Sequence, residues 1–271
     1  MKMNLEEKYQ RLIAYIKELD RVAVAFSSGV DSTFLLYAAK QAVGDNAIAI
    51  TAISDLIPKR EQDEATKFCR DNGIKQIVYN ANPFEVEGFS GNPSNRCYIC
   101  KKHLFSHMKA LALGQDIKYV LEGSNLDDEG DYRPGMQAIA ELEILSPLRI
   151  IGFTKQEIRE LSSEFGLPTA NKPSFACLAS RIPYEETITE NKLFMVEKAE
   201  ELLYNEGFKQ FRVRIHGDDL ARIEVLPEDF NRFMDEDYRI RIYDILKIYG
   251  FNYVSLDLKG YRTGSMNEVL K

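Results

Sequence analysis

Short apolar segments that alternate with helical segments constrain the fold of this 271-residue chain more than any other feature. Residues 22–26 and 47–53 are apolar almost throughout, which is typical of strands buried on both faces of a sheet. Two more strands are predicted at residues 76–79 and 119–123, and a shorter candidate at residues 143–148. Strands that alternate with helices form parallel sheets with helices on both faces. The sequence therefore predicts an α/β fold with a parallel, doubly wound sheet.

The predicted helices of this region lie before, between and after the strands, at residues 5–19, 33–43, 59–72, 97–111 and 154–165. Two of these helices carry clear end signals. Gly73 follows one of them at the usual C-terminal capping position. Thr154 and Glu157 have the spacing of a capping box at the start of another helix, and Gly166 follows its end.

The pattern changes after about residue 183. Helices are predicted there at residues 191–206 and 228–249, and strands at residues 211–215, 220–225 and 253–258. This mixture is typical of a small α+β module. We therefore predict two domains, residues 1–183 and residues 184–271.

The composition is that of an ordinary globular protein, with 45% hydrophobic and 28% charged residues. A formal net charge of −7 disfavours a broad nucleic-acid-binding surface, so nucleic acid is not expected as a partner. No apolar run approaches the length of a membrane span, and the first residues predict an amphipathic helix, not a signal peptide. We therefore expect a cytoplasmic protein whose four cysteines stay reduced.

The turn after the first strand has the sequence Ser27-Ser28-Gly29-Val30-Asp31-Ser32. Where a strand ends and a helix begins, backbone N–H groups without intrahelical partners create a site for an anion. The serine hydroxyls add donors, and Gly29 widens the choice of backbone conformation. Asp31 stands at the helix start, where it can cap the helix or orient a metal ion. On these residues alone, a capped helix that binds no ligand remains an alternative to a phosphate site.

The same turn resembles the PP-loop signature Ser-Gly-Gly-x-Asp-Ser of the N-type ATP pyrophosphatases. The resemblance implies the fold of the adenine nucleotide alpha hydrolases and a loop that holds the β- and γ-phosphates of ATP. It also implies transfer of AMP to a substrate oxygen, release of pyrophosphate, and Mg²⁺ held by Asp31. The residues implied to bind ATP are Ala25, Ser27, Ser28, Gly29, Asp31, Ser32, Ser54 and Gly123. Ser28 departs from the signature, and if its backbone needs a positive φ, the serine costs on the order of 1 kcal/mol.

Cys97 and Cys100 form a C-x-x-C motif at a predicted helix start, and Cys177 lies far downstream. The helix N-terminus and neighbouring basic residues favour the thiolate forms. From the residues alone, three interpretations stay open: unliganded thiols or a transient redox pair, a zinc site completed by His103 or His107, and a three-cysteine iron–sulfur cluster. Cys69 is expected to be a small buried core residue.

Segments spread over most of the chain resemble the LarE family of ATP-dependent sulfur transferases, namely residues 123–128, 131–135, 177–184, 212–216, 221–224 and 260–264. The resemblance implies that the carboxylates of a pyridinium dicarboxylate mononucleotide become thiocarboxylates, in biosynthesis of the nickel-pincer nucleotide cofactor. Members with a C-x-x-C motif imply a [4Fe–4S] cluster on Cys97, Cys100 and Cys177, with sulfide or another donor supplying the sulfur. Members without it sacrifice the sulfur of one cysteine at or next to the position of Cys177, which leaves Cys177 alone as a second source.

Arg212 and Arg214 alternate on a predicted strand, so both side chains are expected on one face. The resemblance implies that they hold the substrate phosphate together with Ser180. A solvated strand face is the alternative. The resemblance adds four further substrate-site candidates, which are Arg181, Asp131, Arg133 and Glu224. For the two carboxylates among them, metal binding and a structural ion pair stay open, and His216 is expected to be structural.

The sequence thus predicts an enzyme that adenylylates a carboxylate and replaces oxygen by sulfur. A tRNA thiolase is an alternative, although the acidic balance and the C-terminal segments count against it. An amide-forming synthetase is another, but it would need an ammonia source and would have no use for three cysteines. A nucleotide-binding regulator without turnover is the last. The family resemblance also implies a homo-oligomer.

Overall fold

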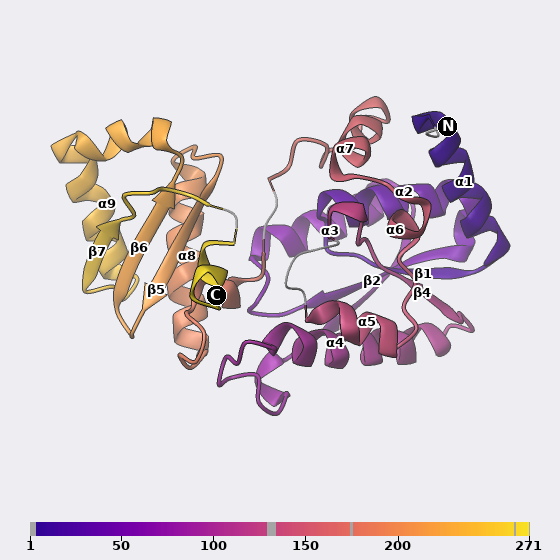
Figure 1. Cartoon of the computed structure of the whole chain (residues 1–271), viewed down its shortest axis with the longest axis horizontal. Coiled ribbons are helices and arrows are strands. Elements are labelled where there is room, and N and C mark those ends of the chain that lie inside the picture. Colours follow the sequence, from indigo (N-terminus) through magenta and orange to yellow (C-terminus); the bar gives the residue numbers. More distant parts are fainter. Residues whose placement is uncertain (1–3, 129–133, 174–175, 263, 271) are drawn as a thin grey trace. The chain divides into compact units, whose positions relative to one another are not determined.

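The computed structural model of the chain describes residues 4–128, 134–173, 176–262 and 264–270. It divides into two compact units (Figure 1). The N-terminal unit comprises Met1–Val86 and Asn95–Phe175, and the C-terminal unit comprises Glu87–Ser94 and Ala176–Lys271. The predicted domain boundary at residue 183 stays a prediction. Among the described residues, no helix has the length and apolar character needed to cross a membrane.

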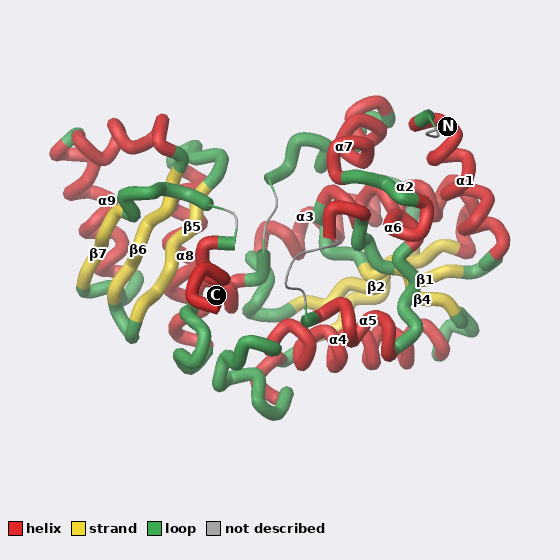
Figure 2. Tube along the Cα trace, in the orientation of Figure 1, coloured by secondary structure: helices red, strands yellow, loops and turns green. Residues whose placement is uncertain are grey.

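A four-stranded parallel sheet forms the centre of the N-terminal unit (Figure 2). β1 (Val22–Ala25) lies between β2 (Ala47–Ile53) and β4 (Tyr119–Leu121), and β3 (Lys75–Asn80) pairs with the other edge of β2. The strand order is therefore β3-β2-β1-β4. This arrangement confirms the predicted parallel sheet and the α/β class.

Helices cover both faces of this sheet because successive strand residues point to opposite sides. Val22 and Val24 of β1 join one core cluster, whereas Ala23 between them joins the other. The first cluster is packed by α1 (Leu5–Glu18), α2 (Val30–Val43), α3 (Lys59–Asp71), α6 (Pro147–Ile151) and α7 (Lys155–Glu164). The second is packed by α4 (Arg96–Leu113) and α5 (Gly135–Glu141). The sheet is thus doubly wound, as predicted.

Most predicted element ends lie within three residues of the observed ones. The capping box of α7 is present: Thr154 accepts from the Glu157 N–H, and Glu157 accepts from the Thr154 N–H. The short strand predicted at residues 143–148 is wrong. Only Leu145 bridges to Leu121, and Pro147 already begins α6. Proline removes a ladder donor and its fixed φ suits the first turn of a helix.

A three-stranded mixed sheet forms the C-terminal unit, with β5 (Phe211–His216) antiparallel to β6 (Leu220–Val225) and β7 (Tyr253–Leu256) parallel to β6. Its helices are α8 (Glu190–Asn205) and α9 (Glu236–Ile248). The single helix predicted at residues 228–249 is wrong, because a 3₁₀ helix at Pro227–Met234 precedes α9. Asp235 separates the two, since its side chain accepts a hydrogen bond from the Tyr238 N–H and so caps α9.

Candidate functional site

The turn Ser27–Ser32 joins β1 to α2 at the carboxyl edge of the parallel sheet. Ligands of open α/β sheets bind at this edge. Gly29 is the N-cap of α2, and no side chain caps the helix. Asp31 therefore does not act as the cap, contrary to one of its predicted roles. The N–H groups of the first turn remain available to an anion.

The serines of the turn hold its shape through short polar contacts. The hydroxyls of Ser27 and Ser32 are 3.2 Å apart, and Ser32 Oγ donates to the Gly29 carbonyl over 3.3 Å. Ser28 is 2% exposed and has a φ of 53°. Ser28 therefore has the left-handed backbone conformation that a glycine, as in the PP-loop signature, adopts without strain. For a serine this conformation costs on the order of 1 kcal/mol.

Gly123 lies directly after β4, where the chain touches the start of α2. A Cβ atom added at Gly123 would lie 3.0 Å from the Ser32 nitrogen and 3.2 Å from the Asp31 carbonyl carbon. Those neighbours are backbone atoms and cannot move without distorting the turn. Gly123 is therefore required for the close approach of β4 to the turn.

Two further predicted ATP-site residues lie at the same edge of the sheet. Ala25 is the last residue of β1, and Ser54 follows β2 directly. Ser54 Oγ accepts a hydrogen bond from the Leu56 N–H over 3.2 Å, which shapes the turn after β2. Because β1, β2 and β4 are parallel neighbours, the fold brings the Ser27–Ser32 turn, Ser54 and Gly123 to one edge. Their contact with ATP stays a prediction.

Asp31 has the electrostatics expected of a metal-orienting carboxylate. Its Oδ2 atom accepts from Lys155 Nζ over 2.6 Å, while its Oδ1 atom is buried and has no hydrogen-bond partner among the described residues. Burial raises the pKa of the Asp31 carboxyl, and the Lys155 ammonium opposes that shift. A buried oxygen of this kind suits Mg²⁺, which prefers hard oxygen ligands.

The cysteines divide between the two units. Cys97 and Cys100 lie near the start of α4 in the N-terminal unit; Cys97 is exposed and Cys100 half-buried. Cys177 is exposed in the C-terminal unit, before a 3₁₀ turn at Leu178–Arg181. Burial raises the pKa of Cys69 to about 12, which agrees with its expected place in the core. Within the described ranges, no three metal-binding side chains are grouped to hold a metal ion.

Arg181 holds the backbone that carries Cys177. Its guanidinium is completely buried, and Nη1 donates to the carbonyls of Ala176 and Cys177 over 2.7 and 3.1 Å. Nε and Nη2 donate to the two carboxylate oxygens of Glu200 over 2.8 and 2.7 Å. Burial alone would raise the pKa of Glu200, but the Arg181 charge holds this pKa below its ordinary value. Direct contact of Arg181 with substrate stays a prediction.

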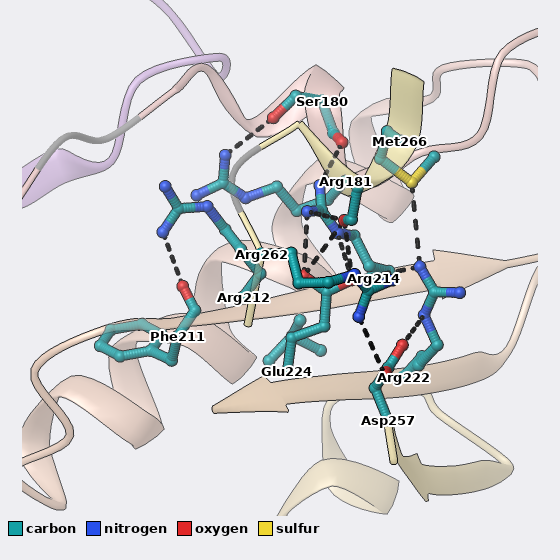
Figure 3. A network of polar contacts seen from close by, with 12 residues as sticks. Ser180, Arg181, Phe211, Arg212, Arg214, Arg222, Glu224, Asp257, Arg262 and Met266 are labelled. Atoms are coloured by element: carbon teal, nitrogen blue, oxygen red, sulfur yellow. Dashed lines mark hydrogen bonds and ion pairs between the residues drawn. The ribbon is translucent and has the colours of Figure 1, made fainter. Parts of the chain in front are cut away.

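Glu224 belongs to a network of polar contacts in the C-terminal unit, drawn in Figure 3 together with Arg181, Arg212, Arg214, Arg222 and Arg262. Glu224 is fully buried and pairs with Arg214 over 3.0 Å and with Arg222 over 3.1 Å. Arg214 also donates to the Ser180 carbonyl over 2.7 Å. The structural ion pair that was the alternative for Glu224 is therefore present. Arg214 also connects β5 to the segment Cys177–Arg181, called the Cys177 loop below.

Arg212 and Arg214 lie on the same face of β5 (Figure 3), and each is 5% exposed, so a solvated strand face is wrong. Arg212 donates to the Phe211 carbonyl, and its guanidinium lies 5.2 Å from the centre of the Tyr261 ring. Burial and then the charge of Arg181 lower the pKa of Arg212 to about 10. An anion placed here would relieve this excess of positive charge.

Other predicted residues are less informative. Asp131 and Arg133 lie outside the described residues. Ser180 Oγ donates to the Cys177 carbonyl over 2.8 Å, so it shapes the cysteine loop. The Nε2 atom of His216 is buried, and burial lowers the pKa of its imidazole.

The sequence reasoning missed Lys155, Lys172, Glu61 and Glu200. Lys172 Nζ lies 3.0 Å from the Ser28 carbonyl and 2.6 Å from Glu61 Oε2. Each of these residues acts through a partner far away in the chain, and none belongs to a recognisable motif. Nothing in the sequence distinguishes these lysines from those on the surface.

Comparison with known proteins finds relatives that match over nearly the whole chain, and two of them are more than 35% identical to it. An uncharacterised protein of Synechocystis sp. is 41% identical over 266 residues, 98% of this chain and 99% of its own length. The pyridinium-3,5-bisthiocarboxylic acid mononucleotide synthase of Lactiplantibacillus plantarum is 37% identical over 271 residues, 98% of this chain and 96% of its own length.

A more distant relative matches a shorter part of the chain. This relative, a subunit of the glutamine-hydrolysing GMP synthase of Thermoplasma acidophilum, is 29% identical over 195 residues, 66% of this chain and 62% of its own length. No family model matches the chain.

Proposed function

Because the chain belongs to the LarE family of pyridinium-3,5-bisthiocarboxylic acid mononucleotide synthases, we propose that it is the ATP-dependent sulfur transferase of this pathway. Its substrate is then a pyridinium dicarboxylate mononucleotide, and its product a precursor of the nickel-pincer cofactor. The match with the Lactiplantibacillus plantarum synthase over 98% of the chain carries the proposal. The start of α2 lies within the turn Ser27–Ser32 and has no side-chain cap. It therefore fits the phosphate site that the chemistry requires.

The first step joins ATP and the substrate. A carboxylate is a poor electrophile, so its oxygen first attacks the α-phosphorus of ATP, and pyrophosphate leaves. In this step the N–H groups at the start of α2 and the serine hydroxyls bind the departing phosphates. Asp31 has a buried oxygen without a hydrogen-bond partner among the described residues, and Mg²⁺, when bound there, would neutralise part of the phosphate charge.

The second step exchanges oxygen for sulfur. A sulfur nucleophile attacks the activated carbonyl carbon, and AMP leaves with the carboxylate oxygen. The buried Arg212 and Arg214 hold the substrate phosphate, which anchors the nucleotide during both steps. Arg181, held by Glu200, fixes the backbone of Cys177. The substrate contacts of Asp131 and Arg133 are part of the proposal, as are the cytoplasmic location and a homo-oligomeric assembly.

For the sulfur source we propose a [4Fe–4S] cluster held by Cys97, Cys100 and Cys177. Cys97 and Cys100 fit such a group because they lie one helical turn apart at the start of α4 and Cys97 reaches the surface. When bound, the cluster would offer an iron atom without a protein ligand to carry the transferred sulfide. Cys177 as a sacrificial donor is the competing source.

Pyrophosphate release tests the activity. The wild-type chain, given ATP, Mg²⁺, the pyridinium nucleotide and sulfide, should release pyrophosphate and form thiocarboxylate, detected by mass spectrometry. Stimulation by tRNA without stimulation by the pyridinium nucleotide would overturn the assignment.

Anaerobic purification tests the sulfur source. We expect iron and a charge-transfer absorption in the wild type, and loss of both in Cys97→Ala. A colourless protein without iron after reconstitution would leave Cys177 as the donor.

A further inference from the structure

Lys172, a largely buried lysine, contacts the turn Ser27–Ser32, which is called the ATP turn below. The ammonium of Lys172 contacts the Ser28 carbonyl over 3.0 Å, Ser28 Oγ over 3.3 Å and Glu61 Oε2 over 2.6 Å. Its side chain is only 12% exposed, and Glu61 is 6% exposed. Lys172 also pairs with Glu64 over 2.5 Å at the surface. Burial of a charged ammonium costs several kcal/mol, so Lys172 requires close pairing with these acceptors.

Lys172 binds the carbonyl of Ser28, the residue whose backbone conformation is strained. Ser28 has a φ of 53°, where the PP-loop signature has a glycine that accepts this angle without strain. The Ser28 hydroxyl donates to the Glu61 carbonyl over 3.0 Å, so side chain and carbonyl are both bound from the same two residues. These contacts offset a strain on the order of 1 kcal/mol.

The hydrogen bond from Lys172 to the Ser28 carbonyl also sets the direction of the Gly29 N–H. In a trans peptide, the carbonyl and the following N–H point in opposite directions. Because Lys172 binds the Ser28 carbonyl, the Gly29 N–H of the same peptide points away from Lys172. A rotated Ser28–Gly29 peptide would instead present a carbonyl dipole to the phosphates.

Lys172 further controls the charge behind the turn. Glu61 Oε2 is bound by Lys172, whereas Arg60 approaches the other oxygen only to 3.8 Å. Without Lys172, a buried carboxylate would stand next to the site that receives a triphosphate. Like charges at short range in a buried site weaken binding strongly.

We propose that Lys172 is a positioning residue of the ATP turn, which clamps the Ser28–Gly29 peptide in its phosphate-binding orientation and replaces the second glycine of the signature. The proposal rests on the proposed ATP-dependent function. It assigns to Lys172 a role in nucleotide affinity, not in the transfer of sulfur.

Binding of a non-hydrolysable ATP analogue with Mg²⁺, measured by calorimetry, tests the clamp. Lys172→Met should raise the Kd, and the KM for ATP in pyrophosphate release, by about tenfold or more, with a much smaller change in kcat. Lys172→Arg, which keeps the charge and the donors, should recover most of the affinity. Lys40→Met is the matched control: Lys40 binds a carboxylate and a carbonyl at the other end of α2, so the Kd should stay unchanged.

A double-mutant cycle with Ser28→Gly separates the clamp from a merely structural ion pair. Glycine adopts the required φ unaided, so Lys172→Met should raise the Kd by a smaller factor in the Ser28→Gly background than in the wild type, and the remaining effect reports the Glu61 carboxylate that Lys172 no longer neutralises. Equal effects in both backgrounds, or an unchanged Kd in Lys172→Met, would overturn the clamp. A wild type that binds the analogue but does not turn over the pyridinium nucleotide would refute only the proposed function, whereas a wild type that binds no analogue would overturn the clamp as well.

Discussion

Replacement of Arg181 by methionine tests the buried ion pair that supports the Cys177 loop. The change leaves the Glu200 carboxylate, which is 2% exposed, without the guanidinium that binds both of its oxygens. Removal of one partner from a buried pair typically costs about 3–5 kcal/mol, because the remaining charge stays desolvated. We expect a loss of this size in the free energy of unfolding, measured by circular dichroism in urea.

Arg241→Met is the matched control. Arg241 also binds both oxygens of its partner, Glu206, over 2.8 Å each, but Arg241 is about half exposed. Exposed pairs contribute little to stability, so this variant should unfold almost as the wild type does. Arg181→Met/Glu200→Gln should be more stable than Arg181→Met alone. Equal, small losses in Arg181→Met and Arg241→Met would refute the reasoning.

The pH dependence of the same variant has a definite sign. In the wild type, the folded-state pKa of Glu200 is held below its unfolded value, so its contribution is present above that value and falls as the pH drops through the folded pKa. In Arg181→Met, the folded-state pKa of Glu200 should be higher than in the wild type, because burial is then opposed only by the Arg212 charge and the Val213 N–H. Protonation of Glu200 then relieves the cost, so the deficit relative to wild type should shrink as the pH is lowered from 7 toward 5.

Three further predictions concern the reaction. Asp31→Asn should lower kcat/KM for pyrophosphate release by about a hundredfold or more and weaken the dependence on Mg²⁺, and a variant with wild-type Mg²⁺ dependence would contradict this role. Cys177→Ala should still release pyrophosphate but form no thiocarboxylate, which mass spectrometry would detect; a thiolated product from this variant would count against Cys177 in either sulfur source. Gly123→Ala should raise the KM for ATP by about tenfold, because its Cβ atom would lie 3.0 Å from the Ser32 nitrogen, whereas Gly91→Ala, whose Cβ atom would come no closer than 3.9 Å to the Gly88 carbonyl oxygen, should not.

Local signals were sufficient to predict the sheet. The apolar run at Ala47–Ile53 has the observed bounds of β2, and the Thr154/Glu157 pair forms the capping box that its spacing predicts. The errors occur where one residue overrides the pattern around it. Pro147 begins a helix inside an apolar run, and Asp235 caps α9 in the middle of a helical pattern.

The residues of the candidate site also fall into those that the sequence could predict and those that it could not. The turn and the paired arginines of β5 could be found from short motifs, because their chemistry depends on neighbours in the sequence. Lys155 and Lys172 could not, since their partners Asp31 and Glu61 lie 124 and 111 residues away. Only the fold decides which of many lysines meets a buried carboxylate. Ser28 lies between these cases: its departure from glycine is visible in the sequence, but the contacts that support it are not.

In the proposed ATP complex, the nucleotide would become a structural part of α2, because no side chain caps the start of this helix. A side-chain cap typically contributes about 1 kcal/mol, and this helix begins at Gly29 without one. ATP phosphates would complete the helix in place of a protein group, so the turn should be the least protected part of the sheet edge in the empty enzyme. Amide hydrogens of residues 29–32 should therefore exchange with solvent faster before nucleotide binds than after, and release of pyrophosphate should return the helix to its open-ended form once in every catalytic cycle.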